Sequence, residues 1–217
     1  MARIGLVHGL GGTAATMEPL AHTLRAAGHE CECVTLPGHG TSAEALVGVR
    51  WAEWVAAVPH AEVLVGQSMG GALALAAAAA RRGGVRLVVA VNTPAPDPDA
   101  LDGLEWRQSR GHDWVDGPPV AEGEVGYTRF PITALIQMVD GSLVTDQSAI
   151  TARVLLLNSD DDDVVDPFST DVLAAGLTGA DSVERAVLRG GGHVATLGPA
   201  AAELAALVLR AAAALDG

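Results

Sequence analysis

The sequence predicts an α/β fold: a mostly parallel sheet of about six strands, flanked by helices and carrying a small cap. Short runs rich in Val and Leu alternate along the chain with longer segments of helical pattern. Most of the short runs are apolar at nearly every position, as expected for strands that helices cover on both faces. Such alternation is typical of parallel sheets. One long interval, residues 95–151, interrupts it and indicates an insertion.

The individual elements follow from these patterns and from the residues that end them. Strands are expected at residues 3–7, 30–36, 62–66, 85–91, 153–158 and 183–188. Helices are expected near residues 13–27, 50–58, 68–82, 167–175 and 198–215. Gly28, Gly83 and Gly84 stand where helices commonly end. Asp166 and Pro167 offer an N-cap followed by a proline at the first helical position.

The interrupting interval is expected to form a unit of its own. Residues 1–94 and 152–217 then make up the core, and residues 95–151 form a cap or lid. The interval shows no convincing strand, and residues 131–148 carry apolar side chains close to helical spacing. Its aromatic residues are Trp106, Trp114, Tyr127 and Phe130. An aromatic-rich insertion after a strand favours a cover over the carboxyl edge of the sheet, where ligands bind in such folds. The alternative is a surface insertion without a binding role, whose aromatic side chains only pack it against the rest of the protein.

Composition limits the partners and the compartment. The chain has 217 residues, of which 49% are hydrophobic, enough for one domain with a sizeable core. Its 26 acidic and 13 basic residues give a formal net charge of −13, which makes nucleic acid and anionic membranes poor partners. The apolar run at residues 72–80 is too short to span a bilayer, and the first residues show no signal-peptide pattern. We therefore expect a cytoplasmic protein without a stable membrane anchor, and the sequence leaves the oligomeric state open.

A serine lies at an expected turn between a strand and a helix. Gly66-Gln67-Ser68-Met69-Gly70 has the pattern G-x-S-x-G, whose small residues permit a tight turn that exposes the serine hydroxyl. The five-residue pattern alone is only suggestive. Its place between a strand and a helix favours a nucleophilic serine over an ordinary glycine-rich turn.

A serine nucleophile requires a base, which an acid in turn orients. His193 follows the last expected strand, on a loop at the carboxyl edge from which it can reach Ser68. The acid is expected after the penultimate strand, where residues 160–163 are all aspartate. Four adjacent carboxylates cannot all be buried against one imidazole. The neighbouring valines favour Asp162 or Asp163, and the pattern does not separate the two.

The chain order Ser, Asp, His and five short motifs resemble the small α/β-hydrolase carboxylesterases related to monoacylglycerol lipases. The motifs are HGLGG at residues 8–12, LPGHG at 36–40, GQSMGG at 66–71, DDVVDP at 162–167 and GHVATL at 192–197. The resemblance implies Ser68 as nucleophile, His193 as base and Asp162 as its orienting acid. It also implies an oxyanion hole formed by the backbone N–H groups of Leu10 and Met69. The leading strands of larger hydrolases are absent, and the cap matches only loosely.

The activity expected from this resemblance is hydrolysis of carboxylic esters through an acyl-enzyme on Ser68. The substrate would be a small-molecule ester with a short- to medium-chain acyl group, or a monoacylglycerol, and no metal or cofactor is required. Thioester hydrolysis, other acyl transfer and carbon–carbon bond hydrolysis stay open because the same triad serves them. Apolar side chains are expected to line the substrate pocket, and the candidates are Trp106, Trp114, Ile136, Met138, Val164 and Val194.

Two other classes of protein fit parts of the sequence. Gly9, Gly11 and Ala14 match the dinucleotide fingerprint G-x-G-x-x-G/A, as in an NAD(P)-dependent oxidoreductase. That fold requires an acidic residue near the end of the second strand, whereas this strand ends in Val-Thr-Leu and Glu32 lies in its interior. The other class is a non-catalytic, hydrolase-like binding protein, which the presence of all three triad residues disfavours.

Overall fold

Six strands form one parallel sheet in the computed structural model, which describes residues 1–118, 120 and 125–215. The order across the sheet is β2-β1-β3-β4-β7-β8, and every neighbouring pair is parallel. The strands are β1 (Arg3–Val7), β2 (Glu30–Val34), β3 (Val63–Gln67), β4 (Leu87–Val91), β7 (Arg153–Ser159) and β8 (Ser182–Leu188). All six expected strands are confirmed, with ends displaced by two residues at most.

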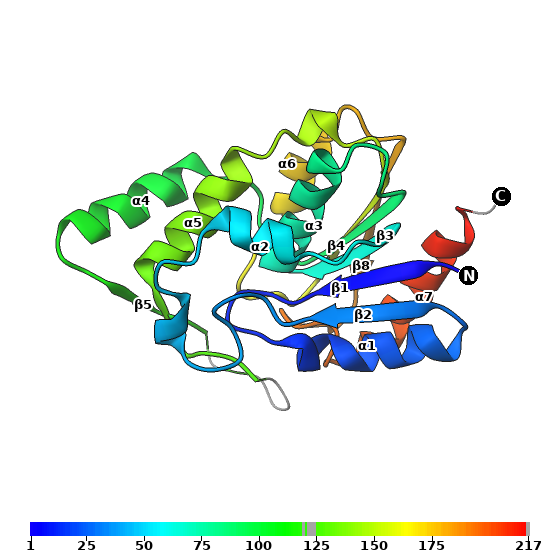
Figure 1. Ribbon diagram of the computed structural model, residues 1–217, viewed down its shortest axis with the longest axis horizontal. Coiled ribbons are helices and arrows are strands. Elements are labelled where there is room, and N and C mark those ends of the chain that lie inside the picture. The colour runs from blue at the N-terminus through cyan, green and yellow to red at the C-terminus, as the bar shows by residue number, and fades with distance from the viewer. Residues whose placement is uncertain (119, 121–124, 216–217) are drawn as a thin grey trace.

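Helices cover both faces of this sheet (Figure 1). On one face lie α1 (Ala14–Ala26) and α7 (Ala201–Ala213). On the other lie α2 (Trp51–Ala57), α3 (Met69–Ala80) and α6 (Ser169–Gly176). Alternate side chains of a strand point to opposite faces, so Val63 and Val65 pack with α1 and α7 while Leu64 packs with α3. The doubly covered parallel sheet that the apolar runs predicted is therefore confirmed.

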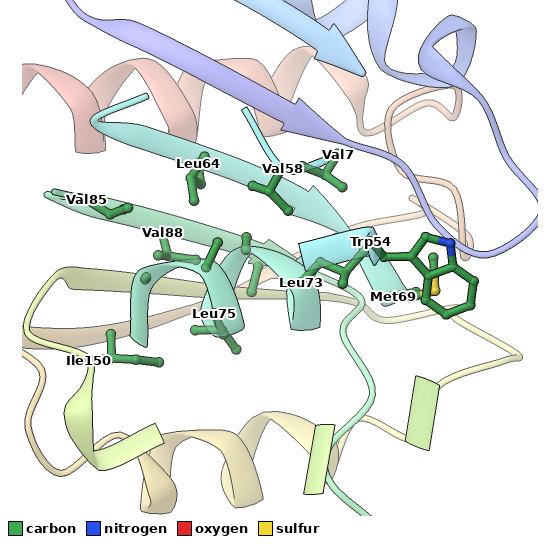
Figure 2. Packing of buried hydrophobic residues seen from close by; sticks show 14 of the residues in the cluster. Val7, Trp54, Val58, Leu64, Met69, Leu73, Leu75, Val85, Val88 and Ile150 are labelled. Atoms are coloured by element: carbon green, nitrogen blue, oxygen red, sulfur yellow. The ribbon is translucent and has the colours of Figure 1, made fainter. Parts of the chain in front are cut away.

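Helix α3 is seated deeply against the sheet. Figure 2 shows Leu73 and Leu75 of α3 in the same buried cluster as Leu64 and Val88 of the central strands. The rest of its buried surface is mainly Ala and Gly, which lets the helix backbone approach the strands closely. Trp54 of α2 is fully buried near the start of α3, and its indole Nε1 donates to the carbonyl oxygen of Pro37 at 2.9 Å. This packing fixes the first turn of α3, next to Ser68.

Residues 95–151 contribute no strand to the main sheet. They form α4 (Pro98–Ser109), β5 (Trp114–Asp116), β6 (Arg129–Pro131), α5 (Ile132–Leu143) and the 3₁₀ turn η2 (Gln147–Ala149). Helices α4 and α5 protrude beyond one end of the sheet, at the left in Figure 1. Strand β5 pairs with β6 in a small antiparallel sheet of its own.

This segment departs from the sequence expectation in two ways. The expectation that it contains no strand is wrong, because three-residue strands are too short to show alternation. Helix α4 was not expected because none of its residues is buried, so it carries no apolar stripe. Its start does carry a signal: Asp97 caps the helix at the backbone N–H of Asp99, with Pro98 in the first turn. Helix α5 confirms the apolar spacing noted within residues 131–148.

The interval also packs on the core through specific contacts. Phe130 is buried, and its ring lies where a side chain on Gly11 would otherwise project. The hydroxyl oxygen of Tyr127 accepts from the backbone N–H of Thr41 at 3.2 Å, and Gln137 accepts from that of Trp51 at 3.0 Å. In the described part of the chain, no helix is both long and apolar enough to cross a membrane.

Candidate active site

Ser68 lies in a strained turn between β3 and α3. Its backbone has φ 55° and ψ −125°, outside the regions that residues with a side chain normally adopt. A Cβ on Gly66 would overlap the carbonyl oxygen of Gly70, and a Cβ on Gly70 would overlap that of Val7. The two glycines of G-x-S-x-G are therefore required by close backbone approach. The turn places the Ser68 side chain at the carboxyl edge of the sheet.

His193 and Asp162 complete a hydrogen-bonded chain with this serine. The distance from Ser68 Oγ to His193 Nε2 is 3.1 Å. On the other side of the ring, Nδ1 lies 3.0 and 3.1 Å from the two carboxylate oxygens of Asp162. The Asp162 side chain is 3% exposed and that of His193 is 17% exposed. The structure thus brings together the three residues that the motifs singled out.

Local hydrogen bonds fix Asp162 in its charged form. The carboxylate Oδ1 accepts from the backbone N–H groups of Val164 at 2.9 Å and Val165 at 3.1 Å. Burial opposes the charged form, but His193 and these N–H groups outweigh burial and hold the pKa of Asp162 below its ordinary value. Asp163, the other candidate from the sequence, faces a neighbouring cavity instead.

The loop after β1 turns back toward Ser68. Gly11 has a φ of +81°, and the N–H of Gly12 donates to the carbonyl oxygen of Gly9 at 3.1 Å. Within the described chain, the N–H groups of Leu10 and Met69 donate to no other residue. A small cavity of about 30 Å³ lies between this loop and Ser68, large enough for one water-sized group. Its lining includes Gly9, Leu10, Ser68 and His193.

The buried imidazole of His8 holds this loop from behind. Its Nε2 accepts from the N–H of Leu36 at 3.1 Å, so the ring proton lies on Nδ1, which donates to the carbonyl oxygen of Gly9 at 2.7 Å. Burial lowers the pKa of His8 to about 3, although the bond to Gly9 acts in the opposite direction. The ring of His39 packs edge-on at 4.9 Å, and burial lowers its pKa as well. Sequence reasoning gave neither imidazole this supporting role.

A larger cavity of about 570 Å³ opens beside Ser68 and His193. The core contributes Leu10, Val164 and Val194 to its walls. The interval 95–151 contributes most of the rest, including Val115, Pro118, Tyr127, Phe130, Leu135 and Met138. The walls are mostly apolar, with the Ser68 hydroxyl and the His193 imidazole at one end. A site of this size and character suits a small ligand with an apolar part.

Comparison with known proteins decides the family. A model of the alpha/beta hydrolase family matches residues 6–207. The chain belongs to this family. The hydrolase is 32% identical over 212 residues to a thermostable monoacylglycerol lipase of Bacillus sp. (strain H-257), covering 88% of this chain and 82% of that lipase.

Solved structures share the fold of this hydrolase. One comes from the work on LipS and LipT, two metagenome-derived lipolytic enzymes, with a TM-score of 0.83 and 24% identity over 96% of this chain and 91% of that one. Another is a monoacylglycerol lipase from Paleococcus ferrophilus, with a TM-score of 0.75 and 20% identity over 95% and 92% of the two chains. The hydrolase is thus lipase- and esterase-like in fold and family, as the motifs predicted. The matching family model is that of the alpha/beta hydrolases and not of an NAD(P)-dependent oxidoreductase.

Only part of the expected pocket lining borders the larger cavity. Met138, Val164 and Val194 lie in the wall of the larger cavity, and Trp106, Trp114 and Ile136 lie outside its described lining. Trp106 is 59% exposed on α4, with the Arg110 guanidinium 5.3 Å from its ring. Substrate contact by Trp106, Trp114 and Ile136 therefore stays a prediction from the sequence, which the described lining of this cavity does not support.

The pocket residues that the sequence did not single out come from the β5–β6 hairpin and one face of α5. Tyr127 and Phe130 were noted only as aromatic residues of the interval, and Leu135 only as part of an apolar period. Their aromatic and apolar character was visible, but the hairpin that turns them toward Ser68 was not. Among the described residues, no group of three or more His, Cys, Asp or Glu side chains is placed to hold a metal ion.

Proposed function

We propose that this hydrolase cleaves carboxylic esters with short- to medium-chain acyl groups, monoacylglycerols among them, through an acyl-enzyme on Ser68. One observation carries the proposal. An unbroken hydrogen-bonded chain runs from Ser68 Oγ through the His193 ring to Asp162, and Ser68 and His193 line a mainly apolar cavity of about 570 Å³. A nucleophile, a base and an acid in this order are the groups that acyl transfer requires. The interval 95–151 is proposed as the cap that encloses the acyl chain.

In the first half of the proposed reaction, Ser68 Oγ attacks the ester carbonyl and its proton passes to His193 Nε2. The negative charge that develops on the carbonyl oxygen is stabilised by the backbone N–H groups of Leu10 and Met69. Asp162 stabilises the imidazolium that forms. His193 then returns the proton to the leaving alcohol, and the acyl group remains bonded to Ser68.

In the second half, water takes the place of the alcohol. His193 accepts a proton from the water as its oxygen attacks the acyl carbonyl. The tetrahedral intermediate then releases the carboxylic acid, and Ser68 recovers its proton from His193. Atoms and charges balance with ester and water alone, so the chain's own groups suffice for every step.

The experiment that tests this proposal labels the nucleophile. Wild-type protein, Ser68→Ala and the control Ser109→Ala, on the exposed end of α4, are incubated with a fluorophosphonate probe and weighed intact. We expect one adduct on wild type and on Ser109→Ala, and none on Ser68→Ala. An unlabelled wild type, or equal labelling of Ser68→Ala, contradicts the proposal. A p-nitrophenyl ester series compared with matched acyl thioesters then shows whether oxygen esters are preferred.

A further inference from the structure

Asn92 follows the last residue of β4 and has no role in the reaction just described. It is 1% exposed, and its backbone has a φ of 47°. In the described part of the chain, Ser68 is the one other residue with a side chain and a positive φ. Asn tolerates this region better than most residues, but the conformation still has a cost. A buried amide in a strained conformation is maintained only where its surroundings hold it.

The Asn92 side chain joins the end of β7 to the loop that carries His193. Its Oδ1 accepts from the N–H of Ser159 at 2.7 Å. Its Nδ2 donates to the carbonyl oxygens of Gly192 and His193, each at 2.8 Å, and lies 3.0 Å from Ser159 Oγ. Every polar atom of the side chain is therefore used, and two of the bonds end on the backbone of the histidine loop.

A second amide reaches the same carbonyl oxygen. Gln67, the last residue of β3, donates from Nε2 to the carbonyl oxygen of His193 at 3.0 Å. The opposite side of the loop is held by Asp161, which accepts from the N–H of Gly192 at 2.7 Å. Gly192 itself has a φ of +58°, so the loop makes a sharp turn just before the histidine. The backbone around His193 is thus fixed from β3, β4 and the loop after β7.

We propose that Asn92 is a positioning residue: its amide, together with that of Gln67, holds the His193 backbone so that Nε2 stays within hydrogen-bond distance of Ser68 Oγ. This inference rests on the proposed function. A displacement of a reacting group by about 1 Å can cost about 100-fold in rate. The loop is the last connection before α7 and contains consecutive glycines, so its own sequence provides little rigidity.

A purely structural role is the competing explanation, since the same amide also ties β4 to β7 through Ser159. The two explanations differ in what a substitution changes. Loss of a structural tie lowers thermal stability and leaves the rate of the folded enzyme unchanged. Loss of positioning lowers kcat of the folded enzyme and leaves KM close to wild type, since Asn92 is absent from the described lining of the ester cavity.

Two substitutions isolate the donor amide. Asn92→Asp keeps the size and the tolerance for positive φ but turns an oxygen toward the two carbonyl groups. Asn92→Gly removes the side chain and relieves the backbone. Asn158→Asp is the matched control, because it makes the same chemical change on neighbouring β7, outside this hydrogen-bond group. On a p-nitrophenyl ester at 25 °C, we expect kcat to fall about 10- to 100-fold in both Asn92 variants. We expect KM to stay within about threefold, and Asn158→Asp to match wild type.

A double-mutant cycle shows whether Asn92 acts through His193. Residues that act as one unit have strongly non-additive effects. We expect Asn92→Gly to lower the activity of wild type but to leave the residual activity of His193→Ala unchanged within about twofold. Full additivity overturns the inference, as does wild-type kcat in both folded Asn92 variants. If neither Asn92 variant folds, Gln67→Met tests the same carbonyl contact, and its wild-type kcat likewise overturns the inference.

The fluorophosphonate experiment separates failure of this inference from failure of the proposed function. An unlabelled wild type contradicts the function itself. A labelled, active wild type with unaffected Asn92 variants contradicts the positioning role alone.

Discussion

At the scale of the residue, four consecutive aspartates occupy four different environments. Asp160 and Asp161 accept from the backbone N–H groups of Gly190 and Gly192, at 2.8 and 2.7 Å. Asp162 contacts His193, and Asp163 faces the larger cavity. Three of the four therefore act on the histidine loop, two through its backbone and one through the imidazole. Neighbouring carboxylates repel one another, and these contacts offset that repulsion.

The difference between Asp162 and Asp163 leads to the first prediction. Asp162→Asn keeps the shape but removes the charge that stabilises the imidazolium, and it also allows the wrong imidazole tautomer. We expect kcat on a p-nitrophenyl ester to fall by up to about 10⁴-fold. Asp163→Asn makes the same chemical change in the adjacent residue and should leave kcat within about threefold. A larger loss in Asp163→Asn would reverse the assignment of the acid.

The sequence singled out Ser68 and His193 as candidates because each stands in a distinctive motif at a predicted strand end. It could not choose between Asp162 and Asp163 from the residue pattern, because neighbouring aspartates have the same chemistry and only the path of the loop distinguishes them. Asn92 was missed for a different reason. A single Asn after an apolar strand has no recognisable pattern, and its function depends on a loop 100 residues away in the sequence.

At the scale of the element, α5 presents different sides to the cavity and away from it. Leu135 and Met138 are three residues apart, close to one helical turn, and both lie in the cavity wall. Ile136 is on the same helix but outside the described lining. This division was not predictable, because the apolar period of α5 marks all these positions equally. Only the packing of α5 on α2, α3 and α4 determines which side faces Ser68.

This geometry leads to a prediction about acyl-chain length. Met138→Trp adds bulk to the wall of a cavity of about 570 Å³, so longer acyl chains lose room before short ones do. For p-nitrophenyl esters we expect kcat/KM to fall at least about 10-fold for octanoate and less than about threefold for acetate.

The control for this prediction is Ile136→Trp, which places the same side chain on the same helix outside the cavity. It should leave the ratio of octanoate to acetate activity unchanged, whatever it does to thermal stability. An equal shift of the ratio in both variants would show that α5, and not the cavity wall, is responsible.

At the scale of the whole molecule, a few buried titratable groups, and not the many exposed charges, make the free energy of unfolding depend on pH. The formal net charge is −13, and the ion pairs among described residues are mostly exposed. Exposed pairs of this kind contribute little to the free energy of unfolding. Buried His8 and His39 are different, because burial lowers both pKa values and so disfavours the charged form of each ring in the folded protein.

The sign of the pH dependence follows from proton uptake. The pKa of His8 is about 3 in the folded protein and 6.5, its ordinary value, in the unfolded chain. Between these values the unfolded chain binds a proton that the folded protein does not, so stability is lost as the pH falls below 6.5. His39 acts in the same direction. Asp162 adds no pH dependence between pH 6.5 and about 4. Its pKa in the folded protein lies below the ordinary value of 3.8, so its stabilising effect is fully present above that pH and is lost only at lower pH.

The last prediction isolates His8 within this whole-molecule effect. His8 is expected to cost about 1 kcal/mol of unfolding free energy per pH unit between pH 6 and 5. For a chain of this length that corresponds to a fall in Tm of about 2–4 °C. His8→Gln removes the titrating ring, so its Tm should be lower at pH 7 but should fall less steeply toward pH 5.

The control is His22→Gln, which makes the same substitution on the exposed side of α1 and should keep the wild-type slope of Tm against pH. Circular dichroism melts at pH 7, 6 and 5 measure all three proteins, and equal slopes in wild type and His8→Gln would show that the buried imidazole does not govern acid stability.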